Sequence, residues 1–237
     1  MDINLLLKGV DCSCGKHHTC DIKYVYIEKN AFTRLGNICL DYKNILIVAD
    51  ENTFGAAGEK TIEALENKNI TKVIFTGKEI LVPNEMAIAE VEKNLEGAEL
   101  IIGIGSGVIQ DLCKYVSFKN KIPYMVVATA PSMDGYASVG SALILKGMKV
   151  TLNAHSPKAI IADTRVLKDA PMEMIQAGYG DIVGKYSALN DWKLSKAVKD
   201  EYFCQYIYDL TFDMLKKTLE LADGLMQRDE ESVKVLM

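Results

Sequence analysis

Short apolar runs alternate with amphipathic segments over roughly the first 165 residues of this chain. Amphipathic helices are predicted around residues 62–65, over residues 84–96 and over residues 109–116. Strands are predicted at residues 23–28, 45–50, 73–76, 100–104, 124–128 and 159–163. Strands that alternate with helices predict a parallel sheet covered by helices on both faces.

The pattern changes toward the C-terminal end. Residues 141–145 and 149–152 predict a hairpin beside the sheet, and strand signals end after Pro171. Residues 181–198 and 201–225 then predict helices. The expected fold class is α/β: a parallel-sheet domain over residues 1–168, followed by the start of an all-helical domain over residues 169–237.

A helical region of this length is small for a core of its own. We therefore expect that the natural protein continues beyond Met237, or that a partner covers the exposed helix faces. A homo-oligomer is the expected assembly.

Composition narrows the class of protein. The 237 residues are 49% hydrophobic and 25% charged, with a net charge of −5 and no block rich in Lys or Arg. Nucleic-acid binding is therefore not expected. No apolar run reaches the roughly 18 residues of a membrane span, and the N-terminus lacks the pattern of a signal peptide. A cytoplasmic protein is expected.

Cysteine and histidine gather near the N-terminus. Three thiols and two imidazoles fall within nine residues, at Cys12, Cys14, His17, His18 and Cys20. Such a set could bind zinc, but its spacing fits no familiar zinc pattern and no second ligand pair is evident in the sequence. A tight surface turn is the favoured interpretation.

The most informative segment is residues 98–111. An apolar run ends at Gly105, Gly107 follows Ser106, and an amphipathic helix begins there. Glycine lets the backbone approach an anion closely, and a helix N-terminus presents free N–H groups and positive charge. A phosphate site is predicted, with a plain tight turn as the alternative.

Asp50 ends another predicted strand. A carboxylate at the carboxyl edge of a parallel sheet can bind the hydroxyls of an adenosine ribose and repels a 2′-phosphate, which favours NAD over NADP. In the common dinucleotide fold the acid follows the glycine turn by about 20 residues, whereas Asp50 precedes Gly105 by 55. The alternative is a solvated loop acid.

Two further segments have polar residues near predicted element ends. The loop after residue 128 offers the hydroxyls of Thr129 and Ser132, and Asp134 could cap a turn or bind a substrate hydroxyl. In residues 177–185, glycines are expected to break the chain before Asp181 opens a helix. Asp181 could be an N-cap or a metal ligand, and Lys185 could pair with Asp181 or with a substrate anion.

Together, the segments GIGSGVIQD, VATAPSMDGYAS and AGYGDIVGKYSALNDW resemble the sn-glycerol-1-phosphate dehydrogenases. That family lies within the iron-containing alcohol dehydrogenase, glycerol dehydrogenase and dehydroquinate synthase group. The resemblance runs from about residue 10 to Trp192 and more loosely to the end. It implies that residues 1–168 form a nucleotide-binding, NAD-binding domain and that residues 169–237 begin an all-helical domain that binds metal and substrate. It implies hydride transfer between NAD(H) and glycerol 1-phosphate or glycerol, with dihydroxyacetone phosphate or dihydroxyacetone as the oxidised partner.

The resemblance also implies roles for individual residues. Asp181 would bind a divalent Zn, Ni or Fe ion and the substrate, and Asp134 would hold a substrate hydroxyl. Lys185 is the candidate partner of a substrate anion. The residues expected to bind the cofactor are Asp50, Gly105, Ser106, Gly107, Val108, Ile109, Thr129, Ser132 and Ser138.

In that family two histidines of the helical domain complete the metal site. The histidines here are His17, His18 and His155, none of them in the helical region, so the histidine-bearing part is expected beyond Met237. Two alternatives stay open: a sugar-phosphate cyclase of the dehydroquinate synthase type, and a non-catalytic NAD-binding module.

Overall fold

The computed structural model describes residues 3–237, and its centre is a six-stranded parallel sheet. The strand order is β3-β10-β7-β6-β4-β5, and each neighbouring pair is parallel. This sheet, with its helices, confirms the predicted α/β class. The strands are β3 (Tyr24–Glu28), β4 (Asn44–Asp50), β5 (Asn69–Phe75), β6 (Leu100–Gly105), β7 (Tyr124–Ala128) and β10 (Ala159–Asp163).

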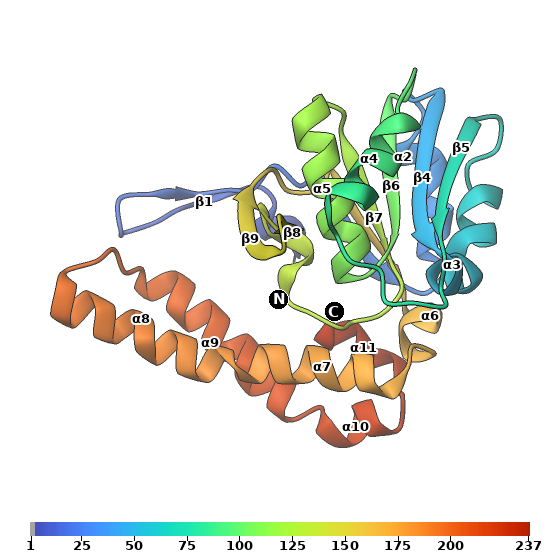
Figure 1. Cartoon of the computed structure of the whole chain (residues 1–237). Coiled ribbons are helices and arrows are strands. Elements are labelled where there is room, and N and C mark those ends of the chain that lie inside the picture. Colours follow the sequence, from blue (N-terminus) through green and yellow to red (C-terminus); the bar gives the residue numbers. More distant parts are fainter. Residues whose placement is uncertain (1–2) are drawn as a thin grey trace.

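Helices cover both faces of the sheet (Figure 1). On one face, Ile45 and Ile47 of β4 pack with α3 (Glu51–Glu63) and with η1 (Ala31–Arg34) and α2 (Leu35–Ile38). On the other, Leu46 and Val48 pack with α4 (Glu85–Lys93) and α5 (Gly107–Asn120). Successive side chains of a strand point to opposite faces, so an unbroken apolar run supplies two cores.

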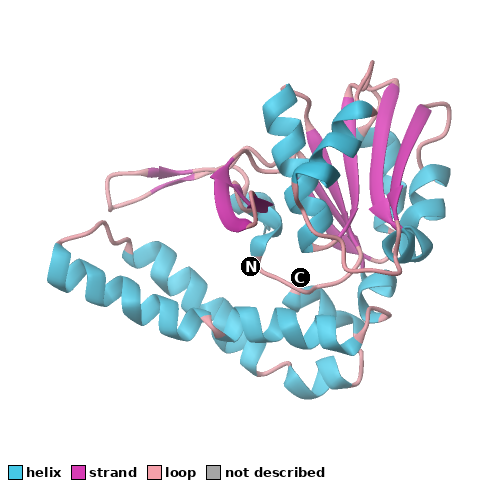
Figure 2. Cartoon of the chain, viewed as in Figure 1, coloured by secondary structure: helices cyan, strands magenta, loops and turns pink. Residues whose placement is uncertain are grey.

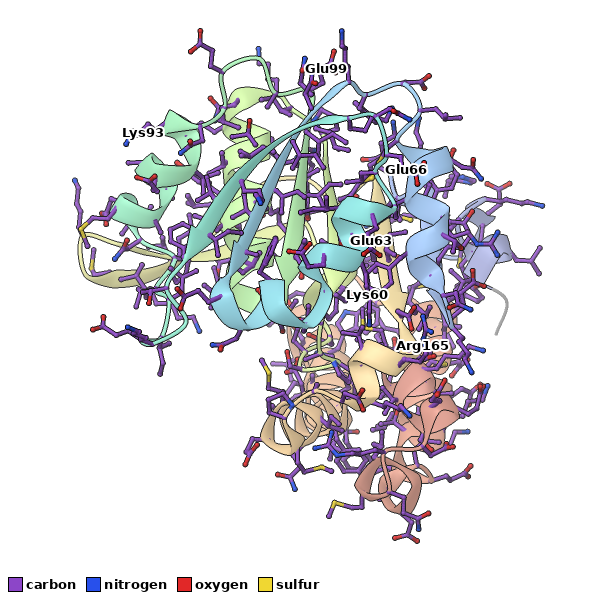
Figure 3. The ribbon with its side chains drawn as sticks, turned by 90° about the vertical axis from the view of Figure 1, so that its right-hand side faces the viewer. Lys60, Glu63, Glu66, Lys93, Glu99 and Arg165 are labelled. Atoms are coloured by element: carbon purple, nitrogen blue, oxygen red, sulfur yellow. The ribbon has the colours of Figure 1, made fainter. Side chains whose placement is uncertain are left out.

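Charged side chains mark the outer surfaces of these helices. Figure 3 shows Lys60 and Glu63 of α3 on one side of the sheet and Lys93 of α4 on the other, and all three are exposed.

The strand order reverses between β4 and β6. From β4 the chain moves outward to β5, whereas from β6 it moves the other way, to β7 and then β10. In an open α/β sheet, ligands bind outside the carboxyl ends of the strands at such a switch point. Asp50 ends β4 and Gly105 ends β6, so both residues lie at this position.

Two small hairpins accompany the sheet. The predicted hairpin at residues 141–152 is confirmed as β8 (Gly140–Leu145) and β9 (Met148–Asn153), and η2 (Gly135–Ala137) precedes it. Near the N-terminus, α1 (Ile3–Leu6) leads into an antiparallel pair, β1 (Val10–Asp11) and β2 (His17–His18).

After β10 all the remaining elements are helices, as Figure 2 shows by colour. No helix in residues 3–237 is both long and apolar enough to cross a membrane. The domain boundary at residue 168 stays a prediction. The elements are α6 (Thr164–Lys168), α7 (Met172–Val183), α8 (Lys185–Lys199), α9 (Gln205–Leu219), α10 (Ala222–Met226) and α11 (Glu230–Leu236).

Two local predictions are wrong. The helix expected over residues 201–225 is instead α9 followed by α10, and the helix start expected at Asp181 is absent. Asp181 does not open a helix, because α7 begins at Met172 and passes through Gly178 and Gly180. The expected single helix over residues 181–198 is the end of α7 followed by α8. Glycine is unfavourable in a helix by propensity. A Cβ on Gly178 would collide with a neighbouring backbone, so Gly178 marks close packing rather than a chain break, whereas a Cβ on Gly180 would meet no neighbouring atom within 4 Å.

Asp163 joins the sheet to the helical region. Its carboxylate is fully buried at the end of β10 and accepts hydrogen bonds from the Arg165 backbone N–H (3.1 Å) and guanidinium Nη2 (2.8 Å). Burial alone would raise the pKa of Asp163, but the hydrogen bonds from Arg165 outweigh it and hold the pKa below its usual value. The folded state therefore favours the ionised carboxylate.

Replacing Asp163 with asparagine keeps a helix cap but removes the charge. Near neutral pH we expect Asp163→Asn to lower the free energy of unfolding by about 2 kcal/mol. The depressed pKa contributes stability above the unfolded-state value of about 3.9, and this contribution is lost as pH falls through the folded-state pKa. Denaturant unfolding at several pH values checks this: the difference between wild type and variant should shrink below about pH 4.

Candidate active-site cleft

The glycine turn has the geometry of an anion site. Gly105 ends β6, Ser106 is the N-cap residue of α5, and no side chain caps that helix. The first N–H groups of an α-helix have no partner within the helix, so those of α5 are free for an anion. A Cβ on Gly107 would meet only the Met133 Sδ, at 3.4 Å, and so the backbone is open on that side.

A cleft of about 460 Å³ lies at the switch point. One wall is Ser106 to Ile109, and Met174 of α7 reaches the cleft from the helical region. The wall from β4, α3 and the loop after β5 contributes Asp50, Asn52, Thr53, Gly77, Lys78, Glu79, Ile80 and Leu81, and Ser132 completes the lining. The structure thus brings six predicted cofactor residues to one cleft. Gly105 directly precedes one of them, Ser106, in the chain.

Asp50 has a second role that the sequence did not reveal. Its Oδ1 accepts a hydrogen bond from the Thr53 N–H (2.9 Å), and the Thr53 hydroxyl lies 3.1 Å from the Asp50 N–H, a reciprocal cap at the start of α3. The cap uses Oδ1, and Asp50 also lines the cleft. The carboxylate is therefore held in place beside the predicted ribose position.

Buried contacts fix the loop that carries Ser132 and Asp134. The Tyr136 hydroxyl donates to the Ala130 carbonyl (2.6 Å), and burial raises the pKa of Tyr136 to about 12, which keeps its proton in place. Gln110 of α5 donates to the Tyr136 carbonyl (2.7 Å). The Ser132 and Ser106 hydroxyls are hydrogen-bonded to each other, so the loop is tied directly to the glycine turn.

Helix α7 approaches this loop at Gly178. A Cβ built on Gly178 would lie 1.8 Å from the Pro131 carbonyl oxygen, which no side chain can tolerate. Gly178 therefore permits a close backbone approach between the helical region and the loop.

Three predicted catalytic residues meet beside this approach. Asp181 Oδ2 accepts a hydrogen bond from the Asp134 N–H (2.8 Å), and Lys185 forms an ion pair with the Asp134 carboxylate. The sequence left Lys185 to pair with Asp181 or a substrate anion, and its partner is Asp134. The Asp134 and Lys185 side chains are each about one-third exposed, and Asp181 is exposed, so solvent and small molecules can reach all three.

Thr129 and Ser138 lie outside the cleft lining. Thr129 is buried, and the Ser138 hydroxyl accepts a hydrogen bond from Lys114 Nζ (2.9 Å). Their cofactor contacts stay predictions.

Lys114 was not singled out from the sequence. Its side chain is 1% exposed, and its Nζ also donates to the Gly140 carbonyl (2.7 Å) and lies 3.7 Å from the Asp111 carboxylate. Burial lowers the pKa of Lys114. In the sequence, the three-residue spacing of Asp111 and Lys114 on one predicted helix was the available signal for their pairing. The hydrogen bonds from Lys114 to Ser138 and Gly140 hold the end of the loop after β7 against α5.

The cleft residue Lys78 was also missed. Its exposed loop after β5 has no glycine motif or helical pattern to mark it. On the helical side, Lys193 Nζ of α8 lies 3.9 Å from the centre of the Tyr208 ring.

With this geometry in place, comparison with known proteins identifies the class. A family model for iron-containing alcohol dehydrogenases matches residues 26–171, more than half of the chain. The chain belongs to the iron-containing alcohol dehydrogenase family.

Individual relatives are more specific. The chain is 32% identical to a glycerol-1-phosphate dehydrogenase [NAD(P)+] of Geobacillus thermodenitrificans, over 99% of this chain and 60% of that protein. It is also 32% identical to one from Methanosarcina acetivorans, over 90% of this chain and 60% of the relative. The chain thus spans about 60% of the length of these curated relatives.

Solved structures support the fold. A glycerol dehydrogenase from Schizosaccharomyces pombe matches with a TM-score of 0.68 at 20% identity, over 91% of this chain and 60% of its own. A probable glycerol dehydrogenase from Sinorhizobium meliloti 1021 matches with a TM-score of 0.76 at 16% identity, over 91% of this chain and 63% of its own. At such identities the likeness shows the shared fold.

Proposed function

We propose that this chain supplies the cofactor cleft and part of the substrate site of an NAD(H)-dependent polyol oxidoreductase. Its reaction is reversible hydride transfer that converts NADH and dihydroxyacetone phosphate to NAD and glycerol 1-phosphate. The unphosphorylated pair, dihydroxyacetone and glycerol, is the other candidate. The observation that carries the proposal is the uncapped start of α5 at the switch point. Hydrogen bonds between Ser106 and Ser132, and from the Asp134 N–H to Asp181, link this helix start to α7. A glycerol-1-phosphate dehydrogenase [NAD(P)+] that is 32% identical to this chain supports the proposal.

The cofactor fits the residues present. The pyrophosphate would accept hydrogen bonds from the N–H groups at the start of α5, where Gly107 leaves the approach open. The adenosine ribose would lie at Asp50, on the opposite wall of the same cleft.

Asp50 gives a test of cofactor choice. Asparagine is as good a helix cap as aspartate, so Asp50→Asn should keep α3 intact while removing the negative charge that disfavours a 2′-phosphate. We expect the ratio of NADPH to NADH affinity to rise about tenfold, equivalent to 1.4 kcal/mol. Fluorescence titration with each cofactor measures it, and an unchanged ratio with intact folding would remove Asp50 from the ribose site.

On the substrate side, Asp134 would accept a hydrogen bond from a substrate hydroxyl, and Lys185 would attract a substrate anion. The ion pair between these two side chains supports assigning both roles to one part of the site. When bound, NADH would supply the hydride for reduction of the substrate carbonyl, and the carbonyl oxygen would take up a proton from the solvent that reaches Asp134 and Lys185.

The proposed metal at Asp181 fits the described side chains only in part. A catalytic zinc usually has three protein ligands, whereas the one group of three or more close ligand side chains in residues 3–237 lies at the N-terminal hairpin. Asp181 remains a predicted ligand of a Zn, Ni or Fe ion, and no step here is routed through that ion. The cytoplasmic location and homo-oligomeric state also stay predictions.

The proposal is tested in two stages: NADH binding with the purified chain, and turnover with a longer protein that carries the predicted histidine ligands. The first measures NADH binding by fluorescence. The second follows loss of NADH absorbance with dihydroxyacetone phosphate or dihydroxyacetone, with and without added Zn²⁺ or Ni²⁺. We expect NADH to bind in the first stage and to be oxidised in a triose-dependent manner in the second. Asp181→Asn should lower the rate of this oxidation at least about 100-fold, equivalent to about 2.7 kcal/mol in activation free energy.

The outcomes separate the alternatives. Binding without turnover in any condition would favour a non-catalytic NAD-binding module. Release of inorganic phosphate from a sugar phosphate without net NADH change would favour a cyclase. Failure to bind NAD(H) at all would contradict the proposal itself.

A further inference from the structure

The N-terminal hairpin carries a second cluster of reactive side chains, remote in sequence from the cleft residues. Cys12 follows β1, His18 lies in β2, and Cys14 lies in the turn between them. Cys204, the N-cap residue of α9, joins them from the other end of the chain. We propose that Cys12, Cys14, His18 and Cys204 bind one structural Zn²⁺ ion.

The distances match a tetrahedral site. The Cys12 and Cys204 sulfurs are 3.6 Å apart, and His18 Nε2 lies 3.3 Å from Cys14 Sγ and 3.4 Å from Cys204 Sγ. All four ligand atoms lie within 4.8 Å of one another. Zinc bonds of about 2.3 Å to sulfur and 2.0–2.1 Å to nitrogen place two sulfurs about 3.8 Å apart and a sulfur and nitrogen about 3.5 Å apart.

The type of ligand selects the metal. Three thiolates and one imidazole are soft ligands that suit zinc, whereas magnesium and calcium require oxygen. Four protein ligands leave no open position, which is typical of a structural rather than a catalytic zinc site. A Cys12–Cys204 disulfide is the competing chemistry, but it would leave the convergence of Cys14 and His18 unexplained.

The surroundings support the four ligands. The Tyr202 hydroxyl lies 3.2 Å from Cys14 Sγ, and Tyr206 stacks on His18 with ring centres 6.1 Å apart. Lys16 Nζ lies 3.5 Å over the Tyr202 ring, so a positive charge stands near the thiolates. Partners around a metal site orient its ligands and tune their affinity for the ion.

The site would connect two distant parts of the fold. Figure 1 shows the hairpin extending toward the α8–α9 end of the helical region. There, Trp192 of α8 donates a hydrogen bond to the Tyr202 carbonyl (2.7 Å), which ties the segment before Cys204 to α8. Strands of two residues form a marginal hairpin in water, so a metal crosslink to α9 would stabilise both partners.

Local sequence could not reveal this set. His17 and Cys20 belong to the same nine-residue segment but lie outside the cluster: His17 Nδ1 is 2.7 Å from Asp11 Oδ1, and Cys20 is exposed. Cys204, expected within a helix, is instead at the start of α9. The favoured interpretation of a surface turn therefore missed a ligand 190 residues after Cys14.

The test uses the purified wild-type chain under reducing conditions. Elemental analysis should find one tightly bound zinc per chain. The cobalt-substituted protein should show thiolate-to-cobalt charge-transfer bands and the strong visible bands of a tetrahedral ion. This measurement requires no variant, and Asp181→Asn should leave the bands unchanged, which separates this ion from any metal at the cleft.

Matched variants identify the ligands. Cys14→Ser and His18→Ala should weaken zinc binding at least about 100-fold, whereas Cys20→Ser and His17→Ala should leave it unchanged. Wild-type cobalt protein without thiolate bands would overturn the proposal. So would equal zinc retention in Cys14→Ser and Cys20→Ser, or a Cys12–Cys204 disulfide in protein freshly purified without reductant.

Discussion

Gly178→Ala should both destabilise the protein and weaken NADH binding. The added Cβ would fall 1.8 Å from the Pro131 carbonyl oxygen, so α7 or the loop must move. Overpacking of this kind costs about 1–3 kcal/mol, and more where backbone must shift. Because Ser132 lines the cleft directly after Pro131, the displacement should also reach the cofactor site.

Gly180→Ala is the matched control on the same helix. A Cβ there would meet no neighbouring atom within 4 Å, and alanine is favoured over glycine in a helix by about 1 kcal/mol. Denaturant unfolding and NADH titration of both variants give the comparison. Equal stability and equal NADH affinity in the two would show that α7 does not approach the loop as described.

Gly107→Ala should separate folding from binding. Its Cβ would lie 3.4 Å from Met133 Sδ, an ordinary contact, and alanine is a better helix residue than glycine. Folding should therefore be unaffected or slightly more stable. The same Cβ would occupy space through which a pyrophosphate approaches the start of α5, so NADH affinity should fall at least about tenfold, or 1.4 kcal/mol.

Thermal unfolding and NADH fluorescence titration measure the two effects on the same preparation. Unchanged NADH affinity in a well-folded Gly107→Ala protein would remove the glycine turn from the cofactor site. A parallel loss of stability would mean that Gly107 acts through folding instead.

The sheet and the glycine turn were predictable because their signals are local. A buried parallel strand needs a continuous apolar run, as in β4 and β6, and the two glycines mark the turn between strand and helix. The adjacency of Asp50 and Gly105 follows from the position of strand ends at one edge of the sheet.

The features that sequence reasoning missed depend on contacts between distant segments. Gly178 looks like a chain break until Pro131 is placed beside it. Lys114 is buried because Ser138 and Gly140 supply its hydrogen bonds. Cys204 completes a ligand set only when the chain returns to the N-terminal hairpin, and no periodicity encodes that return.

A crystal structure of the chain with NADH tests the central claim most directly. We predict pyrophosphate oxygens within about 3 Å of the backbone nitrogens at Gly107 and Val108, and the adenosine ribose beside Asp50. A dinucleotide bound away from the cleft between β4 and β6, with no contact to the start of α5, would contradict the account.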